Sequence, residues 1–192
     1  NSSNFTWPDG FTFEAYRLVI RSPFIWTSFY NSIYCATLTT FIGVLFTAML
    51  AYPLTKKTLI GNKVFSFLVV FCMIFNGGMI PTYLVVKSLG LINSLWALIL
   101  MAIVTPYNTI VMKNFFTSLP TELEEAAFID GAGPLRIFFT IVLPLSKAVL
   151  ATIGLWLAVA SWNNFMMPLI YLNDREFFTL PLYVRQVIDG QL

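Results

Sequence analysis

The sequence contains no histidine, only two cysteines and few charged residues, which make up 10% of its 192 residues. Without histidine, most zinc and haem sites and the Ser-His-Asp triad are excluded. Cys35 and Cys72 each lie inside an apolar run, where we expect small buried hydrophobic side chains rather than a disulfide or a redox pair. The net charge of +2, with no basic cluster larger than Lys56–Lys57, argues against a nucleic-acid-binding protein.

Hydrophobic residues, in contrast, make up 58% of the chain, and aromatic residues make up 17%. Soluble domains carry roughly 25% charged residues, and a domain of this size still exposes about a third of its chain's surface to water. This chain has too few polar residues to cover such a surface, so we predict an all-α membrane protein. It does not begin with methionine, and we expect it to be a piece of a longer protein.

Four apolar segments are long enough to cross a membrane, which takes about 20 residues in a helix. Each contains proline or glycine, which predicts broken helices whose backbone groups are covered by neighbouring helices. The four together predict a polytopic helical bundle. The predicted boundaries are 1–32 for an external or interfacial segment, 33–54, 64–86, 95–112 and 148–172 for the transmembrane helices, 113–147 for a cytoplasmic loop and 173–192 for an external loop.

The orientation follows from the lysines in the short loops. Lys56, Lys57 and Lys63 lie between the first two predicted spans, whereas Lys87 alone lies between the second and the third. Because positively charged loops favour the cytoplasmic side, the first loop is predicted to be cytoplasmic. By alternation, the segment 113–147 is cytoplasmic as well.

This cytoplasmic segment concentrates acidic residues in a way that predicts a short helix. Pro120 suits the first helical position, and acidic side chains behind it stabilise the positive end of the helix dipole. A capping box of Thr121 with Glu124 is an alternative start. Gly131 suits the left-handed residue that ends a helix. The acidic residues are Glu122, Glu124, Glu125 and Asp130.

A second short helix is expected to open at Gly133–Pro134, so the segment predicts a helix–turn–helix. A solvated helix that merely joins two spans would show the same composition. The spacing of the residues distinguishes the two interpretations. Glu125-Ala126-Ala127, then Gly131, then Ile141-Val142-Leu143-Pro144 resembles the EAA signature of the membrane subunits of ABC importers.

Three further segments, 76–83, 90–98 and 162–174, resemble carbohydrate permeases of the maltose type, and most of all their LplC-like branch. The chain is therefore identified as a member of this family of binding-protein-dependent inner-membrane components. The resemblance implies the transmembrane fold of a type I ABC importer. Members have six spans, so this piece would hold spans two to five with the cytoplasmic coupling helices.

The resemblance also implies partners: a second homologous permease, two cytoplasmic ATPase subunits, an extracytoplasmic solute-binding protein and the lipid bilayer of the bacterial cell membrane. ATP and Mg²⁺ would be bound by the ATPase subunits, so this chain is expected to hold no cofactor, no metal and no catalytic residue. The residues expected to couple to the ATPase are Glu122, Leu123, Glu125, Ala126, Ala127, Phe128, Asp130, Gly131, Ile141, Leu143 and Pro144.

A sugar path through the membrane needs hydrogen-bonding groups and aromatic faces. Aromatic side chains at these depths also serve as lipid-interface residues or core packing, and buried amides also tie helices together. The partner permease can carry the main contacts to the sugar. The candidates are Asn76, Tyr83, Tyr107, Asn108, Trp156, Ser161, Trp162, Asn163 and Asn164.

The predicted function is the permease subunit of an importer for a carbohydrate, with oligosaccharides, including acidic ones, as the expected cargo. An ABC permease for a non-sugar solute such as amino acids or peptides is the alternative, because it shares the EAA loop. An intramembrane enzyme would need ionisable residues at depth, and here they lie near or outside the span ends. A scaffold subunit would leave the coupling signature unexplained.

Overall fold

The computed structural model describes residues 22–189, and every regular element in this range is a helix, as the composition predicts. Predicted features of residues 1–21 and 190–192 lie outside the described residues. The elements are α2 (Pro23–Ala51), η1 (Pro53–Thr55), α3 (Asn62–Ile74), α4 (Met79–Ser88), α5 (Leu95–Ala102), α6 (Pro106–Thr117), α7 (Thr121–Ile129), α8 (Pro134–Ile137), the π-helix η2 (Phe138–Val142), α9 (Leu143–Leu145), α10 (Lys147–Asn163), α11 (Met166–Tyr171), η3 (Arg175–Phe177) and α12 (Leu180–Ile188).

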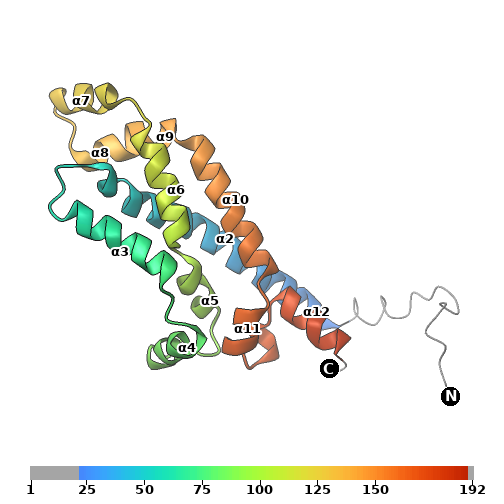
Figure 1. Ribbon diagram of the computed structural model, residues 1–192. Coiled ribbons are helices and arrows are strands. Elements are labelled where there is room, and N and C mark those ends of the chain that lie inside the picture. The colour runs from blue at the N-terminus through green and yellow to red at the C-terminus, as the bar shows by residue number, and fades with distance from the viewer. Residues whose placement is uncertain (1–21, 190–192) are drawn as a thin grey trace, which may run out of the picture.

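Helix α2 is the axis of the bundle, with α6 and α10 packed along it (Figure 1). Small residues occupy much of its buried face, and these allow the close helix approach typical of membrane bundles. At Gly154 of α10, for example, an added Cβ would lie 3.5 Å from methyl groups of Thr40 and Val44. The buried residues of α2 include Ser28, Ser32, Cys35, Thr39, Gly43, Thr47, Ala48 and Ala51.

Two hydrophobic cores hold the helices together. The first core joins α2, α6, the α8–η2 segment and α10, and it includes Tyr52, Met112, Phe116, Phe138 and Ile153. The second core joins α2, α4, α5, α11 and α12, and its buried side chains are Cys35, Val86, Ala97, Leu98, Ile99, Tyr171, Leu172, Phe178 and Leu182.

The helices are broken, as their proline and glycine residues predict. The segment 23–55 is long and apolar enough to cross a membrane by itself. If each bent pair of helices forms one span, up to four segments of the described chain could cross. The axes bend by 114° between α3 and α4, by 43° between α5 and α6, and by 80° between the segment 134–145 and α10. Gly78, at a φ of 84°, lies at the sharpest of these bends, where a side chain would be strained.

Several helix boundaries differ from the boundaries of the predicted spans. The first helix begins at Pro23 rather than at residue 33, because Pro23 fits the first turn and no further proline follows it before Pro53. The predicted span 64–86 is two helices joined at a sharp angle, and the predicted span 95–112 breaks before Pro106 and then continues to Thr117. The predicted span 148–172 breaks at Asn164.

The predicted external loop 173–192 is mostly helical where it is described. Helix α12 packs on the first part of α2, where Leu182 is buried. The Asn31 side-chain amide donates to the carbonyls of Glu176 (2.7 Å) and Phe178 (3.0 Å). The backbone N–H of Leu180 donates to Ser32 Oγ at 2.8 Å. These polar contacts across the chain fix the segment 176–180, which leads into α12, against α2.

Candidate functional site

Helix α7 and the short helix α8 lie together at one end of the bundle, at the upper left of Figure 1. The prediction of a helix–turn–helix here is confirmed. Helix α7 ends in two hydrogen bonds, from Gly131 N–H to the Phe128 carbonyl (3.0 Å) and from Ala132 N–H to the Ala127 carbonyl (2.9 Å). Gly131 has a φ of 81°, so it is the left-handed residue that this helix end requires. Pro134 then opens α8 as predicted.

The start of α7 differs from both predicted versions. Pro120 is the residue before the first helical turn, and Thr121 makes no capping hydrogen bond. The capping box fails because the carboxylate of Glu124 is engaged elsewhere. It accepts a hydrogen bond from Tyr52 Oη at 2.9 Å and forms an ion pair with Lys56.

One face of α7 is open to solvent and carries most of the coupling residues predicted within this helix. Glu122 and Glu125 are exposed, and so are large apolar side chains, with Phe128 68% and Leu123 45% exposed. Ile129 is 85% exposed. Apolar side chains beside carboxylates on a protruding helix are typical of a surface that binds another protein.

The other face of α7 is turned toward the protein. Glu124 and Ala127, one helical turn apart, are the only half-buried residues of this helix. Ala127, predicted as a coupling residue, packs against the first core. The sequence analysis considered Glu124 for a capping box and did not include it among the coupling residues. An acidic residue beside the Glu-Ala-Ala signature is visible in the sequence, but its partners Tyr52 and Lys56 lie far away in the chain.

The second half of the signature also points inward. Ile141 and Leu143 are half-buried and pack against the first core, next to the buried Phe138 and Val142. Pro144 is exposed, as is Asp130 at the end of α7. Ile141 and Leu143 therefore fix the segment that follows α8 against the first core.

A cavity of about 740 Å³ opens between α7 and the end of α2. The paired side chains of Lys56 and Glu124 line it, together with the apolar side chains of Phe128, Ile129 and Ile137. The coupling candidates of α7 and the turn at residues 56–58 therefore share one recess at this end of the bundle.

The predicted sugar-path residues do not form one site. Tyr107 of α6 and Trp156 of α10 lie together, with ring centroids 5.8 Å apart, and both are exposed. Ser161 and Asn164 line a separate cavity of about 110 Å³ with the hydroxyl-bearing Thr105. Asn108 is buried, with 6% of its surface exposed.

The remaining path candidates have local roles. The Asn76 side chain accepts from Gly78 N–H at 2.9 Å at the break between α3 and α4. The Asn163 amide donates to the Val159 carbonyl at 3.0 Å. The other two are packed against aromatic rings, Tyr83 on Tyr171 (6.2 Å) and Trp162 on Phe29 (6.0 Å).

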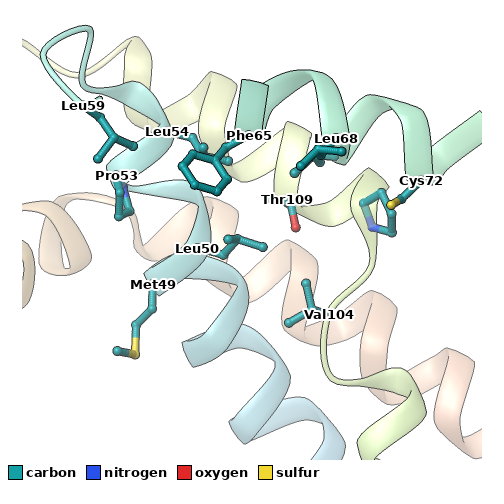
Figure 2. A pocket seen from close by; sticks show the side chains of 12 residues that line it. Met49, Leu50, Pro53, Leu54, Leu59, Phe65, Leu68, Cys72, Val104 and Thr109 are labelled. Carbon is teal, nitrogen blue, oxygen red and sulfur yellow. The ribbon is translucent and has the colours of Figure 1, made fainter. Parts of the chain in front are cut away.

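A third cavity, of about 440 Å³, lies between α2, α3 and α6 (Figure 2). Its lining is apolar apart from Thr109 and Cys72, and the Thr109 hydroxyl already donates to the Thr105 carbonyl at 2.9 Å. This lining offers a sugar few hydrogen-bonding partners, so the cavity is a poor candidate for a polar path.

The sequence model of one protein family matches residues 36–191, that is, most of the chain. Its description is "Binding-protein-dependent transport system inner membrane component". The chain belongs to this family. Its members are transport subunits rather than enzymes.

Relatives within the family include Protein LplC of Bacillus subtilis (strain 168), which is 47% identical over 185 residues. The polygalacturonan/rhamnogalacturonan transport system permease protein YtcP of the same strain is 45% identical over 181 residues. These alignments cover 96% and 94% of this chain, but only 63% of each relative. The chain therefore spans about 63% of the length of these two curated relatives.

The fold is also found in a solved structure, a bacterial ABC transporter involved in the import of the acidic polysaccharide alginate. One chain of it matches with a TM-score of 0.90 and 33% identity, over 100% of this chain and 69% of that chain. The prediction of a type I importer fold is confirmed.

Proposed function

We propose that this chain is the core of a multi-pass permease subunit of a bacterial ABC importer, and that α7 is the coupling helix that docks on an ATPase subunit. The observation that carries the proposal is the two-sided character of α7. Its outer face presents Glu122, Glu125 and Phe128 to solvent, while its inner face is held by Glu124 and Ala127. A helix held in this way can receive force from outside without detaching.

In this mechanism, Glu125 pairs with a basic side chain in a groove of the ATPase, and Phe128 supplies apolar contact area. Closure of the ATPase on ATP moves the groove, and α7 follows as a rigid body. The chain runs on from α7 through the Gly131 turn and the π-helix into α10. Displacement of α7 therefore tilts α10 against α2 and alternates access to the path.

In the complete importer, this permease and a second homologous one would span the inner membrane. Two ATPase subunits and an extracytoplasmic solute-binding protein would complete the assembly. ATP and Mg²⁺ would be held by the ATPase subunits, and this chain would hydrolyse nothing. The family description, which names both the binding protein and the inner membrane, supports this arrangement.

We propose a carbohydrate as the cargo. The names of the relatives refer to polygalacturonan and rhamnogalacturonan transport and to import of an acidic polysaccharide, which favours an oligosaccharide and keeps acidic ones among the candidates. Within this chain, the exposed rings of Tyr107 and Trp156 offer the aromatic faces on which sugar rings stack.

Cysteine cross-linking in the full-length importer tests the coupling assignment. The variant Ala126→Cys places a thiol on the exposed face of α7, and Ala127→Cys places one on the inward face of the same turn. The background needs Cys72→Ser, because Cys72 is exposed. A cysteine series along the ATPase groove supplies the partners.

We expect disulfides from position 126 whose yield changes with ATP. This yield should exceed that from position 127. The absence of any cross-link to the ATPase in an assembled complex would overturn the coupling assignment. For the cargo, uptake of labelled oligosaccharides by cells with and without the permease gene is the direct assay. Uptake of peptides alone would show that the carbohydrate proposal is wrong.

A further inference from the structure

Glu124 forms a polar cluster that ties α7 to the end of α2. Its Oε2 atom accepts a hydrogen bond from Tyr52 Oη at 2.9 Å and pairs with the ammonium group of Lys56. The same ammonium nitrogen lies 4.6 Å from the centroid of the Tyr52 ring. The side chain of Glu124 is only 18% exposed, so solvent screens this ion pair less than a surface pair.

Tyr52 in turn is fixed by the first core. It is 8% exposed, and its ring lies 6.4 Å from that of Phe116 on α6 and 5.2 Å from that of Phe138 on η2. A tyrosine packed on two helices has little freedom to follow its partner. The carboxylate of Glu124 is therefore held by a rigid group.

The hydrogen bonds continue from this cluster into α3 and α6. The Asn62 side-chain amide donates to the carbonyls of Leu54 and Lys56, both at 2.9 Å. Ser66, one turn further along α3, donates to Asn62 Oδ1 (3.4 Å) and accepts from Lys113 Nζ of α6 (2.9 Å). A contiguous chain of polar contacts thus links α7 to the ends of α2 and α3 and to α6.

We propose that Glu124 is the positioning residue that joins the coupling helix to α2 and α3, with Lys56 and Tyr52 as its anchors. Through the backbone, α7 is continuous with α6 on one side and with α8, η2 and α10 on the other. Through Glu124, a displacement of α7 is also transmitted to the end of α2 and to α3. Both sets of helices then move together when α7 is displaced. This inference rests on the proposed coupling role of α7.

The test measures solute transported per ATP hydrolysed by the full importer in proteoliposomes. Glu124→Gln and Lys56→Gln remove one charge each from the pair, and both are expected to lower this ratio by about fivefold or more, the lower range of a coupling between sites. Lys57→Gln is the matched control, because Lys57 is the next residue in the chain and is exposed. It should keep the wild-type ratio.

The combination of Lys56→Glu with Glu124→Lys restores the ion pair in reversed order and should recover most of the ratio. If Glu124→Gln does not assemble, Tyr52→Phe decides the question. It keeps the packed ring and removes one hydrogen bond, and about a twofold lower ratio is expected. A wild-type ratio in Tyr52→Phe and Lys56→Gln would overturn the inference.

The Ala126→Cys cross-link separates this outcome from a failure of the proposed function. If the cross-link to the ATPase forms and the anchor variants behave as wild type, the anchor is refuted and the coupling helix stands. If no cross-link forms in the assembled complex, both are overturned.

Discussion

Two glycines in the central helix pair should respond in opposite ways to the same substitution. Gly43 of α2 and Gly154 of α10 are both buried in helices. Alanine at Gly43 would place its Cβ 2.8 Å from Leu157 Cδ1 and 3.0 Å from the backbone carbonyl oxygen of Ile103. At Gly154 the nearest atoms are methyl carbons at 3.5 Å, which is ordinary contact.

The magnitudes follow from two opposing effects. Replacing glycine by alanine inside a helix stabilises the protein by about 1 kcal/mol, whereas overpacking a tight site costs roughly 1–3 kcal/mol. The Leu157 methyl group can rotate, but the Ile103 carbonyl belongs to the backbone at the α5–α6 break and cannot. We therefore expect Gly43→Ala to destabilise by about 1 kcal/mol and Gly154→Ala to stabilise by about 1 kcal/mol.

The assay is thermal unfolding of the full-length protein in detergent, followed with a dye that fluoresces on reacting with thiols. Cys35 is buried and reports unfolding, provided that the exposed Cys72 is replaced by serine. A difference of about 2 kcal/mol corresponds to roughly 4–8 °C between the two variants for a domain of this size. Equal shifts in the same direction would refute the close approach of α2 to the α5–α6 break.

Three further predictions concern the turn after α7, the loop contacts near α11 and the exposed aromatic pair. Gly131→Ala should lower the amount of solute transported per ATP hydrolysed while membrane insertion stays normal, because alanine in the left-handed backbone conformation costs about 1 kcal/mol. Gly133→Ala is the neutral control, because Gly133 has a φ of −73°, which alanine adopts without strain. Asn93→Ala should lower the melting temperature by roughly 4 °C or more, since Asn93 Oδ1 accepts two backbone hydrogen bonds at 3.0 Å that alanine cannot replace; an unchanged melting temperature would contradict this. Trp156→Ala should reduce uptake about tenfold and Tyr107→Phe much less, because stacking depends on the ring face and not on a hydroxyl; an unaffected initial rate for Trp156→Ala would remove the pair from the path.

The structure of the segment 120–134 could be predicted largely from local chemistry. A left-handed helix end needs glycine, and an opening turn accommodates proline, so Gly131 and Pro134 specify their positions without help from the rest of the chain. The capping box of Thr121 with Glu124 could not be judged in the same way. The same carboxylate has a better partner in Lys56, which only the fold brings near.

The roles of the predicted path residues, in contrast, could not be predicted from local chemistry. Asparagine and aromatic residues in apolar segments are compatible with a path, a helix break or a core, and composition does not distinguish these. Asn76 satisfies a backbone group at a helix break, and Tyr83 packs on Tyr171, whereas Tyr107 and Trp156 meet on an exposed face. Each outcome depends on which helices become neighbours.

The sequence by itself determined the all-helical membrane class, the fact that several apolar segments are broken, and the signature that marks α7. These features depend on composition and on interactions within a few residues, which act in any fold. Only the tertiary structure decided how sharply the helices bend, that α12 packs on α2, and that Glu124 of α7 reaches Tyr52 and Lys56. Contacts between residues 68 to 148 positions apart, such as Lys56 with Glu124 and Ser32 with Leu180, depend on the packing of whole helices and leave no local pattern in the chain.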